Sequence, residues 1–234
     1  MDFKFTSKRI FFLVLFFVLV LIGKNINFSP LVGTQNQFFT LFEFFGPTAG
    51  AFLGPVFGVI AVLFSQIADF LIVGKEWSYL SVLRFLPALF AVIYFGSKKK
   101  YLSVFISPIC MFLFILHPVG KQAWPYTLYW LIPLLGIIPN KFPGSLVFRS
   151  LGATFTAHAI GGVIWLYTVP MSVEQWITLI PIVAYERILF GLGIAGSYVV
   201  FNTVLDYVVD KWKISAPNIL FLEKRYSLLR FLSK

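Results

Sequence analysis

The chain has 234 residues, of which 59% are hydrophobic and only 12% are charged, and its formal net charge is +10 at pH 7. Soluble domains typically carry about 25% charged residues, so this composition excludes a soluble enzyme as well as a disordered or fibrous protein. The apolar runs are continuous rather than alternating, which disfavours a membrane β-barrel. We therefore expect an all-α, polytopic helical membrane protein.

Eight apolar segments are predicted along the chain. The first follows Lys4, Lys8 and Arg9 and lacks a small-residue cleavage site, so it is expected to be a retained anchor rather than a signal peptide. The long apolar run 38–73 is divided at Gly54-Pro55, a typical break. The expected segments are 10–22, 38–53, 56–73, 80–95, 101–116, 126–139, 146–169 and 176–209. Because a crossing needs about 20 residues and several segments are shorter, we expect about 6–8 transmembrane helices.

The basic residues predict the orientation. Most of the 19 Lys and Arg residues fall on the side of the N-terminus, whereas Lys24, Lys75 and Lys121 fall on the other side. The positive-inside rule then places both termini in the cytoplasm. Basic residues that face anionic lipid also explain the net charge, so we expect no nucleic-acid partner.

Two regions are expected. Residues 1–209 form a single transmembrane helical domain, and residues 210–234 form a cytoplasmic basic tail. In the tail, apolar residues are spaced among Lys and Arg over 218–234, which predicts an amphipathic helix lying on the bilayer surface or against a cytoplasmic partner.

A few ionisable side chains interrupt the apolar segments. Such residues are costly in a membrane and usually face a cavity or a partner. None falls clearly in the inner half of the predicted topology, which favours a water-accessible cavity that opens outward. Alternatively, Arg84 could reach lipid headgroups, and Glu186 and Arg187, which point to different sides of a helix, could pair with other helices, for example Glu186 with Arg84. The residues are Glu43, Asp69, Arg84, His158, Glu186 and Arg187.

The aromatic and glycine residues carry further information. Most Trp residues, including Trp130 and Trp165, are expected near the outer face, as an interfacial belt or as the walls of a pocket for a flat heterocyclic ligand. Small residues every fourth position let helices approach closely, and Gly46, Gly50, Gly54 and Gly58 follow this spacing. No catalytic signature, phosphate-binding loop or metal-ligand motif is present, so we expect no enzyme, cofactor or metal.

Residues 42–61, FEFFGPTAGAFLGPVFGVIA, resemble the second-to-third helix region of energy-coupling factor (ECF) transporter S components, where a Gly-Pro-x-x-Gly corner joins two helices. The basic N-terminus, first helix and polar outer loop follow the same order, and residues 157–162, AHAIGG, and the long last helix resemble the family's closing hairpin. The resemblance covers roughly the first 75 and the last 65 residues.

The resemblance implies a membrane-embedded, substrate-binding subunit of a vitamin-like micronutrient importer in the plasma membrane. In that family the subunit captures a small molecule from outside and works with a coupling membrane subunit and cytoplasmic ATPases. The family's first helix commonly bears a small-residue docking stripe that 10–22 lacks, so docking would fall to Gly46, Gly50, Gly54 and Gly58. Carried over by position, the substrate-binding residues are Thr34, Gln35, Gln37, Trp130, His158, Trp165, Glu186 and Arg187.

Two other functions remain open at this point. The chain could be an integral membrane enzyme that acts on a lipid or isoprenoid, with His158 and Glu186 as acid and base. It could also be an assembly subunit that binds no ligand. The outward cluster of polar residues favours the binding subunit.

Overall fold

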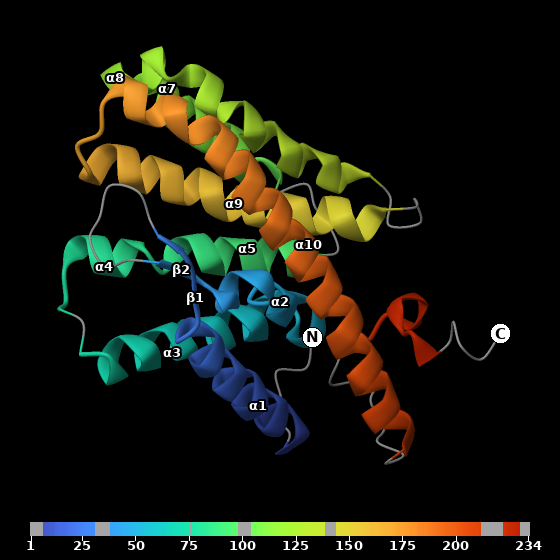
Figure 1. Cartoon of the computed structure of the whole chain (residues 1–234). Coiled ribbons are helices and arrows are strands. Elements are labelled where there is room, and N and C mark those ends of the chain that lie inside the picture. Colours follow the sequence, from blue (N-terminus) through green and yellow to red (C-terminus); the bar gives the residue numbers. More distant parts are fainter. Residues whose placement is uncertain are drawn as a thin grey trace.

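The computed structural model describes residues 7–30, 38–74, 76–97, 104–138, 144–211 and 222–229, and the protein is mostly helical. Figure 1 shows the helices lying roughly side by side, with α9 between two groups of neighbours. The elements are α1 (Ser7–Lys24), β1 (Asn27–Pro30), β2 (Phe38–Thr40), η1 (Leu41–Phe44), α2 (Thr48–Leu53), α3 (Pro55–Ile72), α4 (Tyr79–Leu83), α5 (Leu86–Gly96), α7 (Ile106–Leu116), α8 (Pro118–Gln122), η2 (Trp124–Ile137), α9 (Ser145–Thr168), α10 (Val173–Lys211) and η3 (Lys224–Tyr226).

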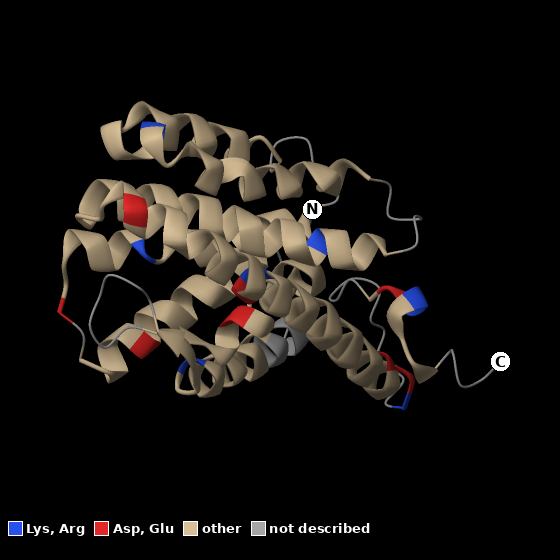
Figure 2. Ribbon diagram, turned by 45° about the horizontal axis from the view of Figure 1, so that its top comes forward, with Lys and Arg blue, Asp and Glu red and all other residues tan. Residues whose placement is uncertain are grey.

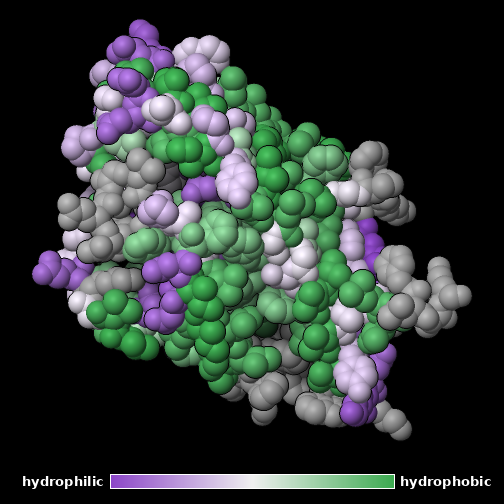
Figure 3. Space-filling model, in the orientation of Figure 1, coloured by the Kyte–Doolittle hydropathy of each residue, from purple (hydrophilic) through white to green (hydrophobic). Residues whose placement is uncertain are grey.

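Three helical stretches in the described part of the chain are long and apolar enough to cross a membrane. They are Pro55–Ile72, Tyr79–Gly96 and Val173–Lys211, and shorter apolar helices occur at Leu13–Lys24 and Ile106–Leu116. Figure 3 shows a broad apolar surface over the middle of one face, with hydrophilic side chains gathered towards its left and lower right edges. A surface with this pattern suits a protein that crosses a hydrocarbon layer.

Helix α9 is central, and its composition follows from that position. It packs against α5, η2, α10 and α7, and its buried side chains include Ser150, Thr154 and Thr156. The hydroxyl of Thr156 donates a hydrogen bond to the backbone carbonyl of Gly152 at 2.7 Å. Because protein rather than lipid surrounds this helix, small and polar residues replace the large apolar ones that a lipid-facing helix needs.

The expected segment 38–53 is not one helix, which corrects the sequence interpretation. It forms β2, the 3-10 turn η1 and the short helix α2, whose six residues are all buried. Pro47 lies directly before α2, and a proline inside a helix removes a backbone hydrogen bond and clashes with the preceding turn. The break at Gly54-Pro55 is confirmed, because Gly54 has φ +81° and Pro55 begins α3.

Two other expected segments also differ from single α-helices. Residues 80–95 are divided into α4 and α5 by a turn at Arg84 and Phe85, and Pro87 is the second residue of α5. Residues 126–139 lie mostly in η2, a 3-10 helix of 14 residues with Pro133 inside it. Apolar composition is the same for these conformations, so the sequence pattern alone did not separate them.

The glycine stripe is used inside the molecule. A Cβ atom on Gly50 would overlap the carbonyl oxygen of Val92 in α5, and one on Gly96 would overlap the carbonyl of Gly50. A Cβ on Gly58 would lie 2.8 Å from the backbone of Ala49 and Gly50. These glycines therefore hold α2 against α3 and α5 at backbone contact, which is the helix-packing role. Gly50 and Gly58 are therefore used in packing within the protein.

The described part of the tail, residues 222–229, is held against α9 and α10. It contains the 3-10 turn η3 where an amphipathic helix was expected over 218–234. The other residues of that expected helix lie outside the described residues. The side chain of Asn202 pairs with both backbone groups of Glu223, at 3.0 Å and 2.9 Å. The backbone N–H of Leu228 donates to Thr203 Oγ1 at 3.0 Å. Three hydrogen bonds therefore fix the path of the tail on α10.

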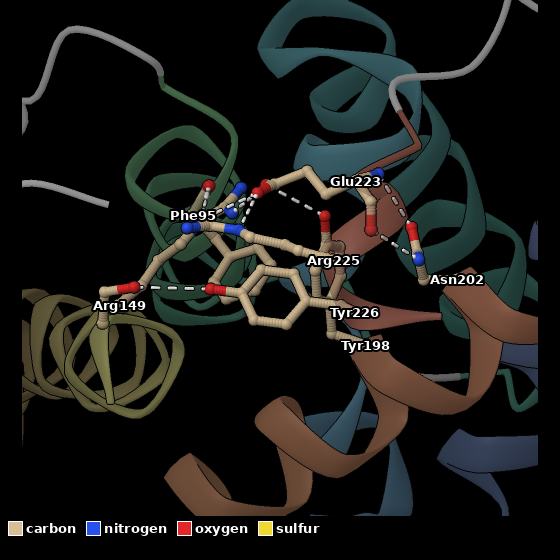
Figure 4. Close-up of polar contacts among 8 residues, drawn as sticks. Phe95, Arg149, Tyr198, Asn202, Glu223, Arg225 and Tyr226 are labelled. Atoms are coloured by element: carbon tan, nitrogen blue, oxygen red, sulfur yellow. Dashed lines mark hydrogen bonds and ion pairs between the residues drawn. The ribbon is translucent and has the colours of Figure 1, made fainter. Parts of the chain in front are cut away.

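The carboxylate of Glu223 is the centre of a polar cluster at this end (Figure 4). It accepts hydrogen bonds from Arg149 Nη1 at 2.9 Å, Arg225 Nη2 at 2.8 Å and the hydroxyl of Tyr198 at 3.1 Å. Burial raises the pKa of the Glu223 carboxyl, but the Arg149 and Arg225 guanidiniums outweigh it and hold the pKa below its usual range. Glu223 thus joins the tail to both α9 and α10 through its charged form.

Candidate functional site

A cavity of about 860 Å³ lies at the end of the bundle opposite the Glu223 cluster. Its walls come from the β1–β2 hairpin and η1, the last turns of α3, the α4–α5 junction, the second half of α9 and the first half of α10. Charged residues are sparse along the helices (Figure 2), yet several line this cavity. They are Lys24, Glu43, Asp69, Glu76, Arg84, Glu186 and Arg187.

Glu186 and Arg187 lie together at the cavity, although they are neighbours on one helix. Both are buried, with 8% and 2% of their surface exposed, and Arg187 Nη2 is 3.6 Å from Glu186 Oε2. The alternative that they point to different sides and pair with other helices is therefore wrong. No ion pair joins Glu186 to Arg84 among the described residues. The two residues pair with each other on α10, and both side chains line the cavity.

The β1–β2 hairpin is attached to α10 beside this pair. The hydroxyl of Ser29 donates a hydrogen bond to Glu186 Oε1 at 2.7 Å. The Arg187 guanidinium lies over the ring of Phe39, 4.4 Å from its centroid, and over that of Phe190 at 4.8 Å. The rings of Phe28 and Phe39 contact Phe190 edge to face, at 5.4 Å and 5.5 Å. Cation–π contacts and ring packing therefore make the hairpin one wall of the cavity.

His158 is engaged at both ring nitrogens. Trp130 Nε1 donates to His158 Nδ1 at 2.9 Å, and the hydroxyl of Tyr126 is 2.8 Å from His158 Nε2. An indole N–H only donates, so Nδ1 accepts and a neutral imidazole carries its hydrogen on Nε2. Nε2 then donates to Tyr126, whose own hydroxyl hydrogen is free to point elsewhere. Since Tyr126 lines the cavity, His158 orients a hydroxyl donor at the cavity wall.

The two tryptophans expected to stack on a ligand have different positions. Trp165 lines the cavity, and the Arg84 guanidinium lies over its ring at 5.1 Å from the centroid. Trp130 is completely buried and contacts Phe114 edge to face at 5.2 Å. It stands behind His158 rather than at the cavity wall. The expected stacking role of Trp130 is therefore replaced by a supporting role.

The structure brings four of the eight expected substrate-binding residues to one cavity: His158, Trp165, Glu186 and Arg187. Thr34, Gln35 and Gln37 lie outside the described residues. The sequence interpretation missed Tyr126 and Trp176 as wall residues, because an interfacial aromatic belt accounts equally well for both. Within the described ranges, no group of three or more His, Cys, Asp or Glu residues is placed to hold a metal ion.

A second ion pair lies at the edge of the cavity. Lys24 Nζ, at the end of α1, is 3.4 Å from Asp69 Oδ2 in the last turns of α3. Asp69 is 4% exposed, so the pair removes an otherwise unbalanced charge from an apolar environment. It also ties α1 to α3 next to the point where the hairpin begins.

Comparison with known proteins gives one relative and no assignment. No family model matches the chain, and no solved structure matches it. An uncharacterized protein of Methanocaldococcus jannaschii is 29% identical over 170 residues, which cover 65% of this chain and 56% of the relative. The match thus spans a little over half the length of the relative, whose name assigns it no activity.

Proposed function

We propose that this protein is a substrate-binding membrane subunit of a micronutrient importer, similar to ECF transporter S components. The observation that carries the proposal is the cavity at one end of the bundle, which combines aromatic walls with the buried pair of Glu186 and Arg187. A charge deep in hydrocarbon is disfavoured by about 2.5–3.5 kcal/mol, so buried polar groups around a large space favour a ligand site.

The proposed ligand is a small, flat heterocycle of vitamin-like size. Ligand cavities typically measure about 300–1,000 Å³, and the volume here, about 860 Å³, lies in that range. Trp165 offers an aromatic face, and Tyr126 offers a hydroxyl donor that His158 orients. These groups suit a ligand that combines a planar ring with polar edges.

We further propose six to eight crossings in the plasma membrane, with both termini in the cytoplasm and the cavity open to the outside. The positions of the connections support a chain that crosses back and forth between two ends of the bundle. The hairpin, the α3–α4 turn, α8 and the α9–α10 link lie towards one end in Figure 1, and the tail lies towards the other. The basic residues favour the tail end as the cytoplasmic one. A coupling membrane subunit and cytoplasmic ATPases would then supply the energy for uptake.

The enzyme alternative gains no support from its proposed base. Both ring nitrogens of His158 are hydrogen-bonded to other side chains, whereas a general base needs a free nitrogen within reach of the substrate.

The experiment is mass spectrometry of small molecules that co-purify with the protein in mild detergent. We expect one heterocyclic compound in roughly stoichiometric amount. Glu186→Gln preserves shape and an acceptor for Ser29, and should reduce the bound amount about tenfold, which corresponds to about 1.4 kcal/mol. Glu174→Gln, on an exposed residue of α10, is the matched control. Equal occupancy in both variants would remove Glu186 from the site, and no small molecule at all would refute the binding subunit.

A further inference from the structure

Two cavity residues of opposite charge stand out because neither makes a hydrogen bond or an ion pair with any described residue. These are Glu43 of η1 and Arg84 at the end of α4. The other buried charges at the cavity are paired, Lys24 with Asp69 and Glu186 with Arg187. An unpaired charge inside an apolar segment is costly. Glu43 and Arg84 are half-buried, whereas Glu76, the remaining charged residue of the wall, is exposed to solvent. Glu43 and Arg84 are therefore the two half-buried charges at the cavity that no described residue balances.

Glu43 belongs to an acidic part of the wall. Arg187 interacts electrostatically with both Glu186 and Glu43, but it forms its ion pair with Glu186. Lys24 also interacts electrostatically with Glu43, but it forms its ion pair with Asp69. Two cations therefore face the three carboxylates of Glu43, Asp69 and Glu186, and this part of the wall has one negative charge in excess. A positively charged or amidine-like group would complete it, because a carboxylate accepts two parallel N–H hydrogen bonds.

Arg84 belongs to a basic part of the wall that is formed by different elements. Its guanidinium lies over the ring of Trp165 in α9, 5.1 Å from the centroid. Stacking on the indole occupies the face of the guanidinium and leaves its N–H edge for an acceptor. Ser78 and Ser81, which line the same region, are hydroxyl groups and bring no negative charge. Glu76, beside them in the wall, is exposed and forms no ion pair with Arg84 in the described part of the chain.

From these two walls we infer that the cavity takes a planar ligand with charges of both signs, a cationic or amidine-like group for Glu43 and an anionic group for Arg84. The inference rests on the proposed binding function and narrows its substrate class. A purely cationic, purely anionic or neutral heterocycle would leave at least one of the two charges unanswered.

The test uses four benzene derivatives of similar size: 4-amidinobenzoate carries both charges, benzamidine the positive one, benzoate the negative one, and benzamide none. Binding to the full-length protein in detergent is followed by quenching of tryptophan fluorescence, since Trp165 and Trp176 line the cavity. We expect 4-amidinobenzoate to bind at least tenfold more tightly than benzamidine or benzoate, and benzamide to bind most weakly. Equal affinity for all four, or a preference for one singly charged probe, overturns the inference.

Two variants assign each charge to its residue. Glu43→Gln should lower the affinity for 4-amidinobenzoate to the level of benzoate, and Arg84→Gln should lower it to the level of benzamidine. Glu174→Gln and Lys121→Gln, on exposed residues away from the cavity, should change nothing. If both cavity variants bind 4-amidinobenzoate as the unmodified protein does, the charges do not select the ligand, and the inference fails.

The probe comparison on the unmodified protein does not depend on the folding of any variant. Its failure is also distinct from failure of the proposed function. A co-purified neutral heterocycle would overturn the two-charge ligand while leaving the binding subunit intact, whereas the absence of any bound small molecule would remove both.

Discussion

Trp130 Nε1 donates a hydrogen bond of 2.9 Å to Nδ1 of His158, and both side chains are at least nine-tenths buried. This bond selects the tautomer of His158 and thereby the direction in which the Tyr126 hydroxyl donates. An indole that does not reach the cavity thus determines which hydrogen-bonding group the cavity presents.

Trp130→Phe removes the donor and leaves His158 Nδ1 buried without a partner. We expect the free energy of unfolding to fall by about 1–3 kcal/mol, the usual cost of a buried unsatisfied group, in addition to lost packing. The measurement is thermal denaturation in detergent. Trp124→Phe, at a residue that is 48% exposed, is the control, and an equal loss in the two variants would contradict the importance of the bond.

Gly50→Ala should be strongly destabilising. The added methyl group would overlap the backbone of Val92 in α5, and neither backbone can move without separating α2 from α5. We expect a loss of at least about 1–3 kcal/mol or failure to fold, measured by yield and by gel filtration in detergent. Gly196→Ala is the matched control on α10, because its Cβ would meet nothing within 4 Å, and alanine is there expected to stabilise by up to about 1 kcal/mol.

Glu223 makes the attachment of the tail sensitive to pH. Because the pKa of its carboxyl is lowered in the folded protein, its contribution is fully present above the pKa of an unfolded glutamate and is lost as pH falls through the lower, folded value. We expect Glu223→Gln to cost about 1–2 kcal/mol at neutral pH. Melting temperatures of the two proteins should converge in acid. A difference that stays constant down to low pH would refute this assignment.

The orientation has a direct test. Reporter fusions after Lys99 and after Lys234 should both indicate the cytoplasm, because the basic residues concentrate on that side. A fusion at Lys75, between α3 and α4, should indicate the outside. An external signal from either of the first two fusions would reverse the proposed direction of ligand entry.

The sequence identified the charged cavity residues better than the aromatic ones, for a physical reason. Glu186 and Arg187 interrupt an apolar run, and the cost of burying charge makes such residues conspicuous. Tyr126 and Trp176 cause no such interruption, since aromatic residues are normal both in cores and at membrane interfaces. Only the three-dimensional arrangement separates a wall residue such as Tyr126 from a supporting residue such as Trp130.

The fold was predictable where glycine and proline residues mark the ends of helices. Gly54-Pro55 separates α2 from α3 as expected, and the expected limits of the last two helices agree closely with α9 and α10. The segment 38–53 failed because hydropathy does not distinguish a short buried helix that follows a strand from one continuous crossing. The 3-10 geometry of η2 was not predicted for the same reason, since its apolar residues are compatible with an α-helix as well as with a 3-10 helix.

Helix α10 is one continuous helix that connects the cavity at one end of the bundle with the attachment of the tail at the other end. Glu186 borders the cavity, and Asn202 holds the tail, roughly 24 Å further along the axis at about 1.5 Å per residue. A tilt of this helix that repositions Glu186 must therefore displace the anchoring point of the tail as well. A change in the cavity that tilts α10 would in this way reach the tail at the opposite end of the bundle through the helix itself, without any intermediate relay of side chains.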